Sequence, residues 1–254
     1  MATATKKELV QIQPMEIERR RIRIVGDSPL IVHTWSEKAR KEIRDKELKI
    51  AGKTRDQRKP VKEAVDSIYW VRERPTAEEV REYEDEHLRL CKDGNTEIAI
   101  EQMDFSGLFH EGYVIGFPAS ALKKAAAAAA YRREWTKDRV SVMCSFQIEA
   151  WDRNAEVEEA LLEKRYIGIQ GSKPVFREDN VVVGIASADL RYRAQIDHWY
   201  ADIVIAYDKH GKYTLDNIVN FLNVAGFTCG IGEWRTEKSG DFGMFHVVEA
   251  DKEK

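Results

Sequence analysis

Apolar and polar residues alternate along several short segments of the chain, with the period expected of β-strands that bury one face. The alternation is clearest in 190–196 and in 200–207, and it extends over 140–150. Short apolar runs between turn-forming residues indicate further strands. The segments predicted as strands are 15–25, 30–32, 97–100, 113–117, 140–150, 181–185, 190–196, 200–207 and 244–248.

Other segments carry the spacing or the start signals of α-helices. In 75–90, Thr76 is a suitable N-cap, and two glutamates follow in the first turn, where the helix dipole favours carboxylates. The six alanines of 125–130 favour a helix over 118–135 that is buried and packs closely on a sheet. The segments predicted as helices are 36–50, 61–70, 75–90, 118–135 and 214–224, with 151–166 either a helix or a connector.

Helices and strands mix along the chain without the regular alternation of a parallel α/β fold. The predicted class is therefore α+β, with an antiparallel sheet. The length of 254 residues fits one large domain or two small ones. We expect a frayed N-terminus over 1–14 and a single domain over 15–254, which carries a helical, charged insertion at about 36–104.

Charge is distributed unevenly along the chain. The net charge is only −3, so no global field points to nucleic acid. Residues 1–62 carry a net charge of +8 and residues 63–112 carry −9. This asymmetry indicates one face for a polyanion and another for a basic surface, which a head-to-tail oligomer would use together. Two solvated helical faces would give the same pattern.

The three cysteines have no CxxC spacing, which favours a reducing, cytoplasmic location and argues against a disulfide framework or a zinc site. No run of eighteen apolar residues occurs, so no membrane span is expected, and the first residues lack the apolar region of a signal peptide. The sequence contains no Walker A, HExxH or GxSxG motif, and we expect neither a metal nor a cofactor.

Five of the fifteen glycines fall in 226–243, which we call the glycine-rich segment. Such clustering is typical of a loop in which other groups approach the backbone closely. Trp234, Arg235 and Lys238 suit a site that binds a phosphate backbone and stacks a base. A long connection that needs many turns would also explain the glycines. Of the six tryptophans, Trp234 is the one expected to be exposed, and the others are expected to anchor the core or an interface.

Three segments, in order, resemble the RAMP superfamily, the RNA-recognition-motif-like proteins that include backbone subunits of CRISPR effector complexes. Ser28–His33 is similar to the opening strand of the family, and Phe117–Lys124 is similar to an Ile-Pro-Gly-Ser-Ser-Leu-Lys-Gly helix start. The third segment, 215–245, resembles the C-terminal helix and glycine-rich loop. The departures from the second motif are Ala119, Ala121 and Lys124. The whole pattern also resembles uncharacterised tailed-phage proteins, which would place the chain in the host cytoplasm.

The resemblance implies a ferredoxin/RRM-like antiparallel sheet with packed helices. It also implies a non-enzymatic protein that binds single-stranded RNA or DNA and assembles as a homo-oligomer along the strand. The helix start at Pro118 and the glycine-rich segment would meet as a cationic cradle, although a purely structural cap would explain Pro118 and Ser120. The residues that would bind nucleic acid there are Ser120, Lys123, Lys124, Gly230, Gly232, Trp234, Arg235 and Lys238.

Two further basic segments are candidates. Lys53, Arg55 and Arg58 lie in a stretch that resembles the protruding insertion of backbone subunits, although a solvated loop fits equally. Arg191 and Arg193 share one face of a predicted strand, where phosphate contacts and salt bridges are equally compatible with the pattern.

His33 is the one candidate for catalysis, because it ends the first family segment. A metal-independent RNA-cleaving enzyme would use it as a general acid or base near a Lys or Tyr. A hydrogen-bonded structural histidine is the alternative. A phage structural or counter-defence scaffold, which binds a protein partner and no nucleic acid, is a third function that fits the sequence.

Overall fold

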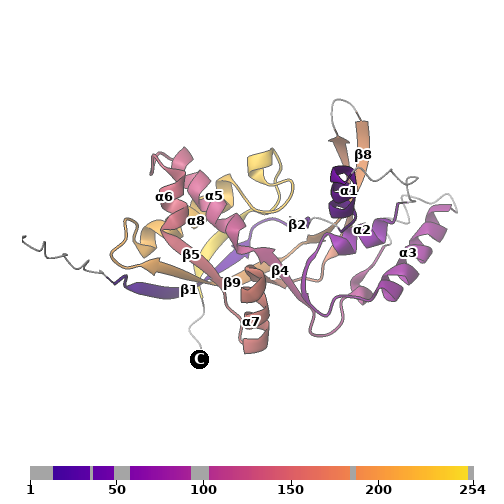
Figure 1. Cartoon of the computed structure of the whole chain (residues 1–254), viewed down its shortest axis with the longest axis horizontal. Coiled ribbons are helices and arrows are strands. Elements are labelled where there is room, and N and C mark those ends of the chain that lie inside the picture. Colours follow the sequence, from indigo (N-terminus) through magenta and orange to yellow (C-terminus); the bar gives the residue numbers. More distant parts are fainter. Residues whose placement is uncertain (1–13, 35–36, 49–57, 93–102, 184–186, 251–254) are drawn as a thin grey trace, which may run out of the picture.

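The structure is a computed structural model that describes residues 14–34, 37–48, 58–92, 103–183 and 187–250 (Figure 1). It confirms the predicted mixture of helices with antiparallel strands. The elements are β1 (Ile17–Gly26), β2 (Leu30–Val32), α1 (Glu37–Glu47), α2 (Pro60–Asp66), β3 (Tyr69–Arg72), α3 (Ala77–Lys92), η1 (Ser106–Leu108), β4 (Val114–Pro118), α5 (Ala119–Arg132), α6 (Arg139–Cys144), β5 (Phe146–Ala150), α7 (Ala155–Lys164), β6 (Tyr166–Gly171), β7 (Val175–Val183), β8 (Ser187–Ile196), β9 (Trp199–Asp208), α8 (Leu215–Thr228), η2 (Thr236–Lys238) and β10 (Phe245–Glu249).

The larger sheet has seven strands, in the order β10-β1-β9-β6-β4-β3, with β5 paired to β9 beside this path. Every strand pair in it is antiparallel. The longest pairing joins β1 to β9, from Ile17 opposite Asp208 to Val25 opposite Tyr200. Strands β1 and β9 therefore lie at the centre of the sheet.

Helices α5 and α8 cover one face of this sheet, and α6 lies beside them (Figure 1). Ile22 and Ile24 of β1 and Ile203 of β9 point to that side and are buried. All six alanines of 125–130 are buried too, as predicted. Because alanine has the smallest side chain that still favours a helix, α5 packs closely against α8 and the sheet.

The opposite face carries α7 on its β3–β4–β6 side (Figure 1). Val157 and Leu161 of α7 pack against Ala150, Val114 and Tyr166 in a small separate apolar cluster. Farther along the same face, β1 and β9 present charged and aromatic side chains instead. The two faces of the sheet therefore differ in chemistry.

A second sheet of three strands has the order β2-β8-β7. Its strand β2 is wholly buried, and α2 packs on β8. The predicted insertion 36–104 contains α1, α2 and α3, but it also contains β3, which pairs with β4 at the edge of the larger sheet. Two antiparallel sheets and the helices packed on them make up the described fold.

Local signals predicted some elements correctly. Strand 30–32 has the predicted bounds, and Thr76 caps α3 by accepting the Glu79 N–H while Glu79 accepts the Thr76 N–H in return. Others were wrong. Residues 139–144 form α6 and not a strand, because the Asp138 carboxylate accepts the N–H groups of Val140 and Ser141 and starts a helix. The helix predicted over 61–70 ends at Asp66, β6 was missed, and the strand predicted at 97–100 lies outside the described residues.

Candidate nucleic-acid interface

The glycine-rich segment folds back on itself and depends on glycine at its turns. Gly243 has φ +66°, and a Cβ placed there would lie 1.8 Å from the Ile231 carbonyl oxygen. The Ile231 N–H donates to the Gly243 oxygen at 2.9 Å, which closes the turn. Trp234 also has a positive φ, of 49°, and its side chain is 37% exposed, as predicted. The segment is thus a fixed turn structure that presents one tryptophan.

The segment docks on the chain just before His33. The Glu233 N–H donates to the Ile31 carbonyl at 3.0 Å, and the Gly243 N–H donates to the Pro29 carbonyl at 2.8 Å. A Cβ at Gly232 would lie 2.5 Å from the same Ile31 oxygen. Two of the three segments singled out in the sequence are therefore in direct contact.

The charged groups of the segment are largely engaged with one another. Arg235 donates to the Gly232 carbonyl at 3.1 Å and pairs with Glu237 at 3.3 Å. Glu237 also binds Arg132 of α5 at 2.6 Å. Partial burial opposes ionisation of Glu237, yet the two arginines hold its pKa below the usual value. Lys238 is exposed. With three carboxylates against two cations over 226–243, the segment alone is not a cationic surface.

The start of α5 lies away from this contact. Arg132, the last residue of α5, makes the hydrogen bonds to Cys229 and Glu237 that join the helix to the glycine-rich segment. Lys123 lies nine residues earlier, about 13 Å along the helix axis at 1.5 Å per residue. Its ammonium binds Gln147 at 2.8 Å, and burial lowers the pKa of Lys123. Ser120 and Lys124 are exposed in the first turns. The segment thus meets the C-terminal end of α5, and not the start at Pro118.

The other predicted cations form salt bridges. Arg58 pairs with Glu63 and with Asp189, each at 2.6 Å, and Arg191 pairs with Asp189 at 3.3 Å. The side chain of Arg193 is only 8% exposed and binds Asp179 at 3.1 Å. For β8, which carries Arg191 and Arg193, salt bridges are the alternative that the structure shows. Lys53 and Arg55 lie outside the described residues.

His33 is held in a hydrogen-bonded cluster. The Arg193 Nε–H donates to His33 Nδ1 at 3.3 Å, and the Tyr69 hydroxyl donates to the His33 carbonyl at 3.0 Å. Burial, and then the charge of Arg193, lower the pKa of His33, so the ring is neutral near pH 7. Burial also raises the pKa of Tyr69 to about 12. Because Arg193 occupies the lone pair that a general base would use, the geometry favours a structural histidine.

Three arginines of β1 project from the face of the sheet opposite α5 and α8; we call Arg19, Arg21 and Arg23 the sheet-face arginines. Asp202 of β9 pairs with Arg23 at 2.8 Å and with Arg21 at 3.6 Å. Arg21 lies 3.1 Å from the ring centroid of Trp151, and Arg23 lies 4.6 Å from that of Tyr200. Arg19 pairs with Glu149 at 3.2 Å. This face is built from matched charges and stacked aromatic rings.

A second cationic surface, which the sequence reading missed as a site, lies at the C-terminal end of α5. Residues 119–139 carry six Lys or Arg against two carboxylates, a net charge of +4. Tyr131 and Trp135 are exposed, Trp135 by 47%, and Arg139 lies 4.6 Å from the Tyr131 ring centroid. Trp135 was expected to anchor the core or an interface, and it lies instead on the open surface among these cations. We call residues 131–139, together with Lys212, the helix-end surface; its exposed cations are Arg132, Arg133, Lys137, Arg139 and Lys212.

The helix-end surface borders a hollow of about 620 Å³. The Tyr213 hydroxyl on its wall donates to Thr136 at 3.0 Å, which ties the start of α8 to the turn after α5. The residues that line the hollow are Trp135, Lys212, Tyr213, Asn217, Asn220 and Phe221. Aromatic, cationic and amide groups thus meet in one concave site.

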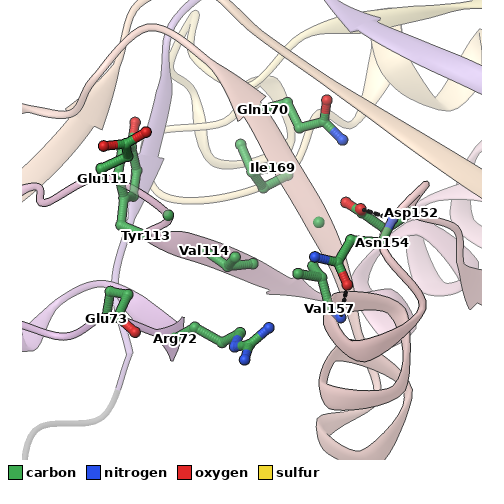
Figure 2. Close-up of a pocket in the computed structure, with 12 residues that line it drawn as sticks. Arg72, Glu73, Glu111, Tyr113, Val114, Asp152, Asn154, Val157, Ile169 and Gln170 are labelled. Atoms are coloured by element: carbon green, nitrogen blue, oxygen red, sulfur yellow. Dashed lines mark hydrogen bonds between the residues drawn. The ribbon is translucent and has the colours of Figure 1, made fainter.

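A second hollow, of about 410 Å³, lies between the β3–β4–β6 strands and the start of α7 (Figure 2). Figure 2 shows Val114 and Ile169 on two neighbouring strands that line it, with Glu73, Glu111 and Asp152 around them. Arg72, its one cation, pairs with Glu156 at 3.3 Å. An excess of negative charge makes this hollow unsuited to phosphate groups.

Within the described ranges, no three His, Cys, Asp or Glu side chains are grouped so that they could hold a metal ion. None of the helices described is both long enough and apolar enough to cross a bilayer. Comparison of the sequence with protein-family profiles and with curated proteins gave no match. The functional argument therefore depends on the geometry of the surfaces above.

Proposed function

We propose that this protein binds single-stranded nucleic acid without cleaving it, and that the helix-end surface is the contact. Single strands are bound by cations that follow the phosphate backbone and by aromatic side chains on which bases stack. The exposed cations of 131–139 and the exposed rings of Tyr131 and Trp135 supply both within one short stretch. The charges do not select between RNA and DNA.

The order of elements supports an RRM-like framework for this function. The path β1-α5-β5-β9-α8-β10 is a βαββαβ sequence, and the pairings put its strands in the order β5-β9-β1-β10 with α5 and α8 on one face. This arrangement is the one expected of a ferredoxin-like fold. It is compatible with membership of the RAMP superfamily, and the remaining elements would be additions to that framework.

The observation that carries the proposal is the exposure of Trp135 at 47% between Arg133 and Lys137. A large aromatic side chain beside a core is normally buried, and here it remains open among positive charges. Arg132 joins this surface to the glycine-rich segment, which carries Trp234 and Lys238, through its 2.6 Å contact with Glu237. A strand could follow this line from the helix end to the segment.

Assembly along the strand, in the host cytoplasm, is part of the same proposal. Helix α3 carries six carboxylates against three cations, and α3 and α6 lie toward opposite ends of the molecule in Figure 1. The exposed carboxylates of α3 are Glu78, Glu82, Asp85 and Glu86. In a head-to-tail homo-oligomer, this acidic end would face a basic surface of the next copy.

The test is fluorescence anisotropy of labelled RNA and DNA 20-mers over a salt series. The triple variant Arg133→Glu, Lys137→Glu, Arg139→Glu should lose affinity at every salt concentration. Its slope of log affinity against log salt should be shallower by about 2, since three phosphate contacts are removed at about 0.7 each for single strands.

The matched control makes the same charge change elsewhere, as Arg153→Glu, Lys164→Glu and Arg165→Glu at the two ends of α7, all three exposed. It should bind like the wild type. Absence of strand binding by the wild type at low salt, or equal losses in the two triple variants, contradicts the proposal.

The RNA-cleaving alternative predicts that wild-type protein shortens a labelled RNA in the presence of chelator and that His33→Ala does not. The engagement of His33 Nδ1 by Arg193 argues against it. Intact RNA after prolonged incubation with the wild type would remove this alternative.

A further inference from the structure

The hollow beside the helix-end surface has walls made by the start of α8 and by the turn after α5. Phe221 is part of its lining, with the Trp135 ring centroid 5.8 Å away and that of Tyr213 5.3 Å away. Phe221 is buried, whereas Trp135 remains half open to solvent. The indole is therefore supported from one side and available from another. A supported, rigid ring is a good surface for stacking a second planar group.

Besides the Tyr213 hydroxyl, which is bound to Thr136, the hollow is lined by one ammonium group and two side-chain amides. Lys212 holds its ammonium 5.1 Å from the Tyr213 ring centroid, at the rim. Its charge also contributes to lowering the pKa of Asp138, after the hydrogen bonds from Ser141 and Val140. Asn217 accepts the Thr214 N–H through its side-chain oxygen at 3.2 Å, which leaves its amide N–H groups for another partner. Asn220 is exposed one turn later.

These groups match the parts of one nucleotide. A base has a flat π-surface for Trp135 and an edge of donors and acceptors for the amides of Asn217 and Asn220, and its phosphate is an anion for Lys212. A volume of about 620 Å³ is within the range of sites that bind small molecules. A purely apolar ligand would make no use of the ammonium group or of either amide.

We propose that the hollow holds one nucleobase of the bound strand, stacked on Trp135, with the neighbouring phosphate on Lys212. The inference rests on the proposed function and assigns it one fixed base position. It implies that a free nucleoside 5′-monophosphate occupies the same hollow.

The test uses protein labelled with 5-fluorotryptophan, observed by ¹⁹F NMR. The six tryptophans give separate signals, and the signal that disappears in Trp135→Phe is that of Trp135. Adenosine 5′-monophosphate should shift this signal in a saturable way. Ribose 5-phosphate, which lacks the base, should not shift it.

Strand binding supplies the second readout. Trp135→Ala should weaken 20-mer binding by about 10-fold with the salt slope unchanged, because stacking is lost and no charge is removed. Lys212→Gln should instead reduce the salt slope by about 0.7. Lys212 is exposed, so Lys212→Gln should keep the wild-type circular dichroism and melting temperature. Trp135→Ala loses the contact with Phe221 and should melt at a lower temperature, but its circular dichroism at the temperature of the binding assay should match that of the wild type.

The outcomes separate the two proposals. If strands bind with the expected salt dependence but adenosine monophosphate leaves the Trp135 signal unmoved, the base site is wrong and the proposed function stands. If ribose 5-phosphate or a proline-rich peptide moves the signal as much as the nucleotide does, the base site is also wrong. If the nucleotide shifts Trp135 but no strand binds, the base site stands without the wider function.

Discussion

The sheet-face arginines and the helix-end surface are both rich in positive charge, but they differ in what surrounds each cation. Arg21 and Arg23 share the carboxylate of Asp202, whose side chain is 3% exposed, and each lies against an aromatic ring. Arg133 and Lys137, by contrast, are exposed at the end of α5 beside an open tryptophan.

The difference shows that burial and pairing, and not the number of arginines, decide which surface can exchange partners with a polyanion. A partly buried guanidinium that already binds a buried carboxylate would have to break that contact to reach a phosphate. An exposed cation has only to release water and counterions before it binds a phosphate. We therefore assign stability to the sheet-face arginines and binding to the helix-end surface, and each prediction below tests that division.

The largest effect is expected on stability from Asp202→Ala. Removal of this buried carboxylate takes away the shared partner of Arg21 and Arg23, and breaking such a network typically costs about 3 kcal/mol or more of unfolding free energy. Urea denaturation followed by circular dichroism measures this loss of unfolding free energy. Glu149→Gln, which breaks the exposed pair with Arg19, should cost less than about 1 kcal/mol.

At a temperature where Asp202→Ala remains folded, its affinity for a single strand should match that of the wild type. A loss of strand affinity as large as that of the helix-end triple variant would mean that the sheet face is part of the interface.

A smaller effect is expected from Arg132→Ala, which cuts the link between α5 and the glycine-rich segment. The Arg132–Glu237 pair is partly exposed, so the variant should lose about 1 kcal/mol or less. Hydrogen exchange should increase in 230–243 and remain unchanged in β1 and β9. Exchange that rises throughout the chain would show that Arg132 supports the whole fold and not this junction alone.

The smallest effect is expected from pH, which should change the unfolding free energy but leave the affinity for a single strand nearly constant. Burial lowers the pKa values of His33 and His87 in the folded protein. Between those lowered values and about 6.5, the unfolded chain binds more protons, so the unfolding free energy falls as pH falls through 6.5. Strand affinity should change little between pH 8 and 6, because the cations of the helix-end surface are Lys and Arg.

Urea denaturation at pH 7.5, 6.5 and 5.5 checks the stability part. His87→Leu should lose less stability over this range than the wild type does. Glu84 acts in the opposite direction, because burial raises its pKa and stability then falls as pH rises above about 4.5. In Glu84→Gln, the unfolding free energy should therefore fall more steeply toward pH 5.5 than it does in the wild type. If neither variant changes the pH dependence of the unfolding free energy, these assignments are wrong.

Sequence reasoning recovered the elements whose signals are local. Thr76 and Glu79 specify the start of α3 by themselves, and Thr214 with Asn217 does the same for α8. The order of strands in the two sheets is not local information, and only the resemblance to a ferredoxin/RRM-like fold implied an order for part of it. The alternation over 140–150 predicts one strand, which is confirmed for 146–150 as β5; before it, the Asp138 cap makes 139–144 a helix.

The site was harder to predict for the same reason. Arg23 and its partner Asp202 are 179 positions apart, and Arg132 and Glu237 are 105 apart. No pattern in the chain shows which cations are neutralised by such distant carboxylates. The glycine-rich segment was found by composition, and the exposure of Trp234 was correct. The run of charges around Trp135 was visible in the sequence, but its exposure depends on the packing of α5 against α8.

Photo-crosslinking of a 5-bromouridine-substituted RNA 20-mer, followed by mass spectrometry of the linked peptides, tests the central assignment most directly. Our account predicts crosslinks to peptides that contain 131–139 and 212–221. Crosslinks confined to peptides of β1 and β9, around Arg21, Arg23 and Tyr200, would contradict it.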